Sequence, residues 1–97
     1  MITPELIKIR KIVCDSFLIE ESELSISGKT KCSIKMAQYA FSYYAYQFTM
    51  NRHNLMSLVG VSSIHHFDRF MKKHTENLCN PQYRKIAERI ELKIKDI

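Results

Sequence analysis

Residues 51–73, NRHNLMSLVGVSSIHHFDRFMKK, contain the pattern on which the fold prediction rests. Asn51 is a favourable helix cap, and three aliphatic residues follow it at helical spacing before Gly60. A glycine just past the last apolar residue is a common way for a helix to end in the left-handed conformation. The sequence therefore predicts a short helix that begins after Asn51 and closes at Gly60.

A second helix is predicted directly after this turn, because Ser62 and Ser63 offer capping hydroxyls. Two helices joined by a short glycine-containing turn form a helix-turn-helix motif, here at about 51–75. The second helix of that motif enters the major groove of DNA, so its first turns are polar and its far side is apolar. The inward positions are Ile64, Phe67, Phe70 and Met71, and the outward ones are His65, His66, Arg69, Lys72 and Lys73.

Three further segments show helical spacing. Thr3-Pro4 and Asn80-Pro81 each place proline after a capping side chain, which predicts helix starts there, the last helix covering about 81–96. A long aromatic helix is predicted next. It is preceded by a short turn at 21–24 and by a basic loop at 25–33, SISGKTKCS. The apolar stripes are Leu6, Ile9, Val13 and Phe17, then Ile34, Ala37, Phe41, Ala45 and Phe48, and finally Tyr83, Ile86, Ile90 and Ile94.

Length and composition favour one all-α domain, residues 1–97, of five or six helices. The 97 residues are 45% hydrophobic, which is enough for one core, and they include only two glycines and two prolines. Small β barrels and sandwiches need many turns built from those two residues, so that class is excluded. One shared core is expected to contain Phe17, Phe41, Ala45, Leu55, Leu58, Phe67 and Met71.

The net charge of +5 is concentrated in the middle of the chain. Residues 26–75 carry seven lysines and arginines against a single acidic residue, Asp68. A basic cluster of this kind is typical of a surface that meets a polyanion such as nucleic acid. From charge alone, a solvated basic surface with no partner remains an equal alternative.

Several other classes of protein are not expected. Three cysteines at wide spacing indicate a reducing cytoplasm in which the thiols are free and buried. The sequence shows no signal-peptide pattern and no membrane-spanning run. A cytoplasmic protein without a membrane partner is therefore predicted. Adjacent histidines on a helix point about 100° apart, and no CxxC or HxxxH pair exists, so no metal site is expected. A core this small leaves little surface to enclose a pocket, so no catalytic site, cofactor or small-molecule substrate is expected either.

Residues 12–94 resemble the C-terminal, DNA-binding domain of the bacterial replication initiator DnaA, a helix-turn-helix domain of the Trp-repressor type. IVCDSFLIEESEL resembles the family's opening helix and its short acidic successor, and KTK followed by CSIKMAQYAFSYY resembles its basic loop and long helix. SSIHHF lies where the family has its Arg-Asp-His-Ser/Thr-Thr-Val signature. The resemblance implies duplex DNA binding in a replication-initiator-like or regulatory role, without ATPase activity because no phosphate-binding loop is present.

The resemblance also implies roles for individual positions. The basic loop reaches the minor groove in the family, the start of the long helix holds a phosphate, and the second helix of the motif reads bases. Arg69 is the candidate for a paired hydrogen bond to guanine. The predicted DNA-binding residues are Lys29, Thr30 and Lys31 in the loop, Lys35, Gln38 and Tyr39 in the long helix, and Ser62, Ser63, His65, His66, Arg69, Lys72 and Lys73 in the motif.

The chain departs from the family at the signature itself. Ser62, Ser63 and Ile64 stand where the family has arginine, aspartate and histidine, so this chain is not expected to read the initiator's recognition box. A stand-alone module of a phage, a mobile element or a small bacterial regulator fits these departures. The alternative is a protein-interaction module that keeps the fold but uses the tyrosine-rich helix or the last helix to form a homodimer or to dock on a replication or regulatory protein.

Overall fold

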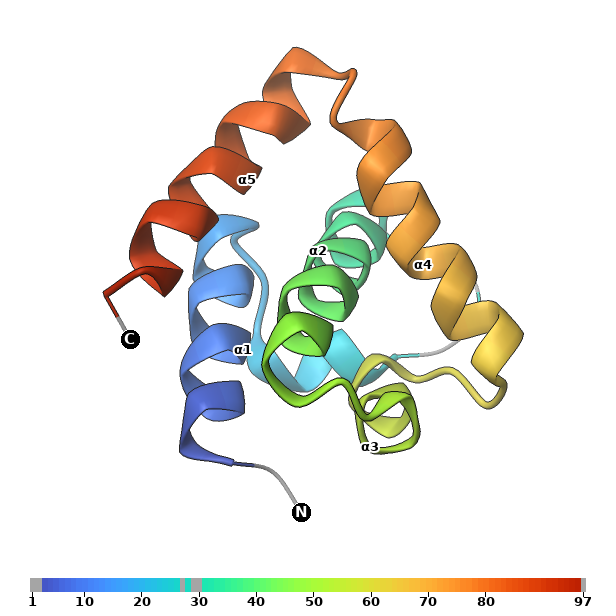
Figure 1. The fold of residues 1–97 in the computed structure, drawn as a ribbon. Helices are drawn as coiled ribbons and strands as arrows, with labels where there is room; N and C mark the ends of the chain where they lie inside the picture. The colour runs from blue at the N-terminus through green and yellow to red at the C-terminus, as the bar shows by residue number, and fades with distance from the viewer. Residues whose placement is uncertain (1–2, 27, 29–30, 97) are drawn as a thin grey trace.

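The computed structural model describes residues 3–26, 28 and 31–96, and these residues form helices and connecting turns with no strand among them. This confirms the predicted all-α class with five or six helices. In Figure 1, α2 runs through the middle of the molecule, with α1 and α5 on one side and α4 on the other. The helices are α1 (Pro4–Ser16), α2 (Cys32–Thr49), α3 (Arg52–Met56), α4 (Ile64–Asn77) and α5 (Pro81–Ile94), and the 3₁₀ turns are η1 (Glu21–Ser25) and η2 (Ser57–Val59).

Four of the five α-helices, all except α2, start where the capping residues of the sequence place them. Thr3 Oγ1 accepts a hydrogen bond from the backbone N–H of Leu6 at 3.2 Å, and Ser63 Oγ accepts one from that of His66 at 3.1 Å. Asn51 and Asn80 cap α3 and α5 in the same way. Each cap satisfies a backbone donor that the first turn of a helix leaves without an intrahelical partner.

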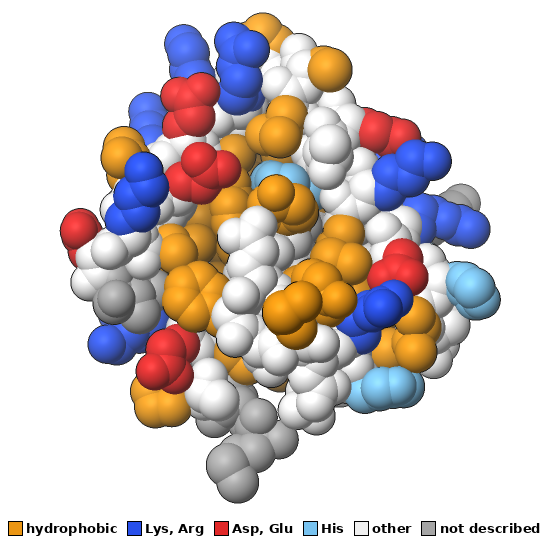
Figure 2. Space-filling view, viewed as in Figure 1, with side chains coloured by type: hydrophobic (Ala, Val, Ile, Leu, Met, Phe, Trp, Pro, Cys, Tyr) orange, Lys and Arg blue, Asp and Glu red, His pale blue; other side chains and the backbone are white. Residues whose placement is uncertain are grey.

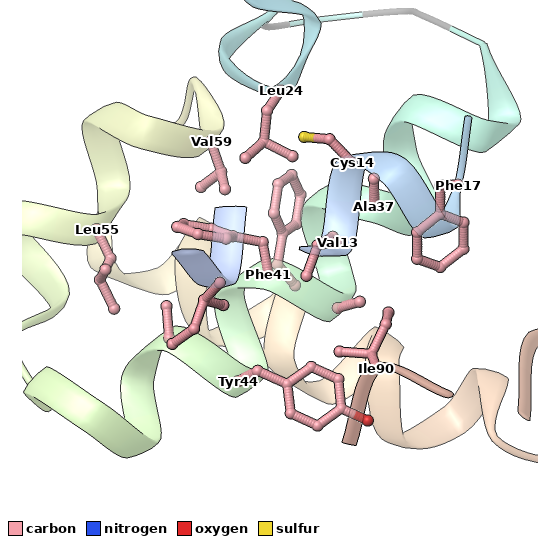
Figure 3. Close-up of a cluster of buried hydrophobic side chains, with 14 of the residues drawn as sticks. Val13, Cys14, Phe17, Leu24, Ala37, Phe41, Tyr44, Leu55, Val59 and Ile90 are labelled. Carbon is pink, nitrogen blue, oxygen red and sulfur yellow. The ribbon is translucent and has the colours of Figure 1, made fainter. Parts of the chain in front are cut away.

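Phe41, on α2, lies at the centre of one continuous core. Figure 3 shows its ring among side chains from α1, η1 and η2, including Val13, Leu24 and Val59. Phe41 and Phe67 are both fully buried. The predicted shared core is confirmed, with Leu58 and Met71 half-buried at its edge.

Three details of the sequence prediction are wrong. Phe48 is 47% exposed, because the last turn of α2 extends past the helices that cover the rest of it and lines an open hollow with Thr3 and Glu5. Cys32 and Cys79 are exposed because they lie at a helix end and in a turn, and only Cys14 is buried. The connection before α2 is shorter than 25–33, since η1 runs to residue 25 and α2 begins at residue 32.

Gly60, in the turn of the helix-turn-helix, packs closely against the backbone at the end of η1, just before the basic loop. Its φ of +69° places it in the left-handed region, as the sequence predicts. A Cβ atom at this position would lie 2.4 Å from the carbonyl oxygen of Ser25 and 2.9 Å from its carbon. Two backbone segments therefore meet here at a distance that only glycine allows.

His74 is buried between α4, α2 and α5. Its Nδ1 shares a hydrogen bond of 2.6 Å with the Tyr83 hydroxyl, and its ring stacks on Tyr43 with centroids 4.4 Å apart. Beside it, the Tyr44 hydroxyl donates to Glu91 Oε1 at 3.0 Å. Burial lowers the pKa of His74 from 6.5 to about 4, so the imidazole is neutral in the folded chain at neutral pH.

Replacing Gly60 with alanine is expected to lower the free energy of unfolding by about 2 kcal/mol or more. The left-handed backbone alone costs a side-chain-bearing residue roughly 1–2 kcal/mol, and the contact with Ser25 adds to this. Urea unfolding measures the change. Gly28→Ala is the matched control, because Gly28 also has positive φ but open space around its Cβ position; equal losses in the two variants would contradict the close approach.

The pKa of His74 predicts a loss of stability in mild acid. Because this pKa is lower in the folded state than in the unfolded one, the unfolded chain binds more protons, and the stability present above pH 6.5 falls as the pH approaches 4. At about 1.4 kcal/mol per pH unit the loss is on the order of 3 kcal/mol. Urea unfolding at several pH values should show a shallower decline for His74→Gln than for the exposed control His53→Gln, and identical declines would refute the assignment.

Candidate nucleic-acid interface

The solvent side of α4 carries three exposed cations, Arg69, Lys72 and Lys73. Successive helix residues lie about 100° apart, so Arg69 and Lys72 point away from Phe67 and Phe70, which are buried against α2. Figure 2 shows lysine, arginine and histidine side chains along the edge that α4 forms. We name this surface the α4 basic face; its residues, all exposed as the sequence predicts, are His65, His66, Arg69, Lys72 and Lys73.

Lys35 borders the α4 basic face on the side of α2. Its Nζ lies 5.2 Å from the centroid of the Phe70 ring, a cation–π distance, and the His66 ring meets the same phenyl ring edge to face at 5.3 Å. The two residues are far apart in sequence, yet both contact one ring. Lys31 is exposed at the cap position of α2, one turn before Lys35, so the basic surface extends toward the start of that helix.

Arg52 borders the opposite side of α4, next to Asp68. Its Nη1 donates hydrogen bonds to both carboxylate oxygens of Asp68, at 3.0 and 2.9 Å. The guanidinium carbon also lies 5.8 Å from the centroid of the Tyr46 ring. The only acidic residue in the basic middle of the chain is therefore neutralised at short range. Sequence reasoning missed this pair, because residues 16 positions apart on different helices carry no local pairing signal.

The remaining predicted site residues differ in accessibility. Lys29 and Thr30 lie outside the described residues. Ser62 and Ser63 are exposed in the turn before α4, and the oxygen of Ser63 is engaged in capping that helix. Tyr39 is half-buried and packs its ring edge to face against Phe70, with ring centroids 5.1 Å apart.

Gln38 is not available to bind a phosphate, and this prediction is wrong. The side chain is fully buried, and its Nε2 donates hydrogen bonds to the carbonyl oxygens of Leu24, at 2.9 Å, and Ile26, at 2.7 Å. These two carbonyls belong to the segment that leads into the basic loop. Gln38 therefore fixes the start of that loop against α2 instead of contacting a ligand.

The described part of the chain offers neither a metal site nor a membrane span. No group of three or more His, Cys, Asp and Glu side chains among those residues is placed to hold a metal ion. None of the described helices is both long and apolar enough to cross a membrane. The candidate site in the described residues is the basic charge on α4 and on the two residues that border it, Lys35 and Arg52.

Comparison with known proteins finds no relative of this chain. No family model matches it, and no curated protein and no solved structure matches it either. The charge, exposure and placement of the α4 basic face therefore carry the functional proposal.

Replacing Gln38 with leucine is expected to destabilise the fold by about 2–3 kcal/mol. The change keeps the side-chain bulk but leaves the carbonyls of Leu24 and Ile26 without their donor, and an unpaired buried polar group costs roughly 1–3 kcal/mol. Urea unfolding measures this loss. Gln47→Leu, at an exposed position of the same helix, is the control, and a similarly small effect at both positions would show that the two hydrogen bonds contribute little.

Proposed function

We propose that this chain binds double-stranded DNA with α4 in the major groove. The observation that carries the proposal is the α4 basic face, on which Arg69, Lys72 and Lys73 are exposed, with Lys73 Nζ 3.7 Å from Glu76 Oε1. Asp68 is the one carboxylate between residues 65 and 73, and Arg52 neutralises it. The surface therefore offers positive charge without a free negative charge in its centre, which suits a polyanion.

The shape of the surface supports a groove-binding mode. An α-helix with its side chains is about 10–12 Å across, close to the roughly 12 Å width of the major groove. The first turn of α4 is preceded by Ser62 and Ser63 and carries His65 and His66, all exposed and able to hydrogen-bond with base edges or phosphates. The inner side of the helix is fixed by Phe67 and the rest of the core, so the polar side is the one left free.

The proposed roles divide into positioning and reading. Lys31, Lys35, Lys72 and Lys73 neutralise phosphates, which supplies affinity on any sequence. Arg69 reads guanine through two hydrogen bonds to its O6 and N7 atoms. Such a module, resembling the DNA-binding domain of DnaA, would act in the cytoplasm as a replication-initiator-like or regulatory protein and would not itself hydrolyse ATP.

A second candidate function is docking on a protein, and exposed apolar side chains favour it. Phe48 and Met50, at the end of α2, are 47% and 69% exposed. Nearby, Tyr43, Gln47 and Ile94 line a hollow of about 240 Å³ between α2 and α5. The hollow between α2 and α5 contains no residue of the α4 basic face, so variants at Tyr43, Gln47 and Ile94 can distinguish the two functions.

Binding to random duplex DNA is expected to weaken at least about a hundredfold between 50 and 200 mM salt, since four or more phosphate contacts each contribute about −0.9 to the slope of log K against log salt.

Lys31→Ala should reduce that slope by about 0.9 on every sequence. Arg69→Ala should cost roughly 1–3 kcal/mol on a selected guanine-containing site and much less elsewhere. Fluorescence anisotropy on both kinds of duplex measures these changes.

Lys85→Ala, on the exposed side of α5, is the control and should leave the slope unchanged. A flat salt response of the unmodified protein would overturn DNA binding and favour the docking function. Equal losses for Arg69→Ala on selected and random duplexes would show that the module holds DNA without reading it through α4.

A further inference from the structure

The hydrogen bonds of Arg52 use only part of its guanidinium group. Nη1 makes both bonds to Asp68, at 3.0 and 2.9 Å, whereas Nε and Nη2 make no hydrogen bond with any described residue. An arginine has five N–H donors in a planar fork, so three of them remain free here. The Arg52 side chain is 39% exposed, so part of it is accessible from solvent.

Two contacts hold the Arg52 side chain in one orientation. The carboxylate of Asp68 fixes one edge of the guanidinium, and the Tyr46 ring lies 5.8 Å from its central carbon. An unrestrained arginine loses rotamer entropy when it is immobilised by a ligand. Here most of that ordering is already present, which favours binding of a second anion at the free edge.

Arg52 and Lys35 lie on opposite sides of α4. Arg52 is bound to Asp68, and Lys35 lies over Phe70. Residues two positions apart on a helix point about 200° apart, so these two contacts flank the helix. Asp68 also lies one turn before Lys72 on the edge of the α4 basic face. A helix in the major groove has a phosphate backbone on each side, and a cation is present on each side of α4.

We propose that Arg52 binds a DNA backbone phosphate through Nε and Nη2, with Asp68 and Tyr46 as the residues that orient it. This inference rests on the proposed DNA-binding function. Lys35 then faces the phosphates of one strand and Arg52 those of the other. The paired donors of the guanidinium match two phosphate oxygens, a geometry that lysine does not offer.

The test combines two variants with one control. In Arg52→Ala, the slope of log K against log salt for a random 20-base-pair duplex should fall by about 0.9, and affinity at 0.1 M salt should fall about five- to tenfold. The double variant Arg52→Ala with Asp68→Asn should show the same loss of slope, because the phosphate contact is absent in both. Arg84→Ala should change neither quantity, although Arg84 is also an exposed arginine beside a carboxylate, with Nε 3.9 Å from Glu88.

Recovery of both slope and affinity in the double variant would overturn the proposal, since Arg52 would then serve only to neutralise Asp68. A second measurement on the unmodified protein does not depend on the variants folding. In ¹H–¹⁵N spectra, the Nε–H resonance of Arg52 should shift on addition of the duplex, while that of Arg84 should not. An unmoved Arg52 resonance would also overturn the proposal.

Comparing the Arg52 variants with Lys72→Ala distinguishes loss of the Arg52 phosphate contact from loss of DNA binding as a whole. If Lys72→Ala lowers the salt slope while the Arg52 variants leave it unchanged, DNA binding stands and the phosphate contact of Arg52 is refuted. If the unmodified protein shows no salt-dependent binding to the duplex at all, both proposals fall together.

Discussion

The packing of α4 on α2 is the interaction on which the rest of the structure depends. Phe67, Phe70 and His74 are buried along one side of α4, and Phe41 of α2 lies at the centre of the core they join. Burial of a large apolar side chain stabilises the fold by about 1.5–3 kcal/mol, far more than any exposed charge pair in this chain. Because these residues fix the inner side of α4, they also determine which side chains face solvent, and between residues 65 and 73 the exposed ones are histidine, arginine and lysine.

A second constraint acts on the backbone where the helix-turn-helix meets the start of the basic loop. Gly60 approaches the carbonyl of Ser25, and Gln38 donates to the carbonyls on either side of that residue, Leu24 and Ile26. Buried carbonyls need donors, and here a single side-chain amide satisfies two of them. The turn before α4 and the segment that leads into the loop are therefore held together by the same few atoms.

The charges of the candidate interface are organised by the apolar core beneath them. The phenyl ring of Phe70 supports Lys35 and His66, and the ring of Tyr46 lies near the Arg52 guanidinium. Cations held over aromatic rings keep their charge in solvent while their side chains are ordered. Aromatic residues of the core thus fix the positions of Lys35 and Arg52. A change that disturbs the core is therefore expected to disturb the candidate interface as well.

The sequence by itself determined the starts of four helices and the inward sides of the helices, because caps at Thr3, Asn51, Ser63 and Asn80 and apolar stripes act within three or four residues. It also identified which residues of α4 face solvent. Only the tertiary structure decided that Gln38 is buried, that Phe48 is exposed, and that Arg52 pairs with Asp68. These outcomes depend on contacts between residues 12 or more positions apart, or on where a covering helix ends, and periodicity along one helix contains no information about either.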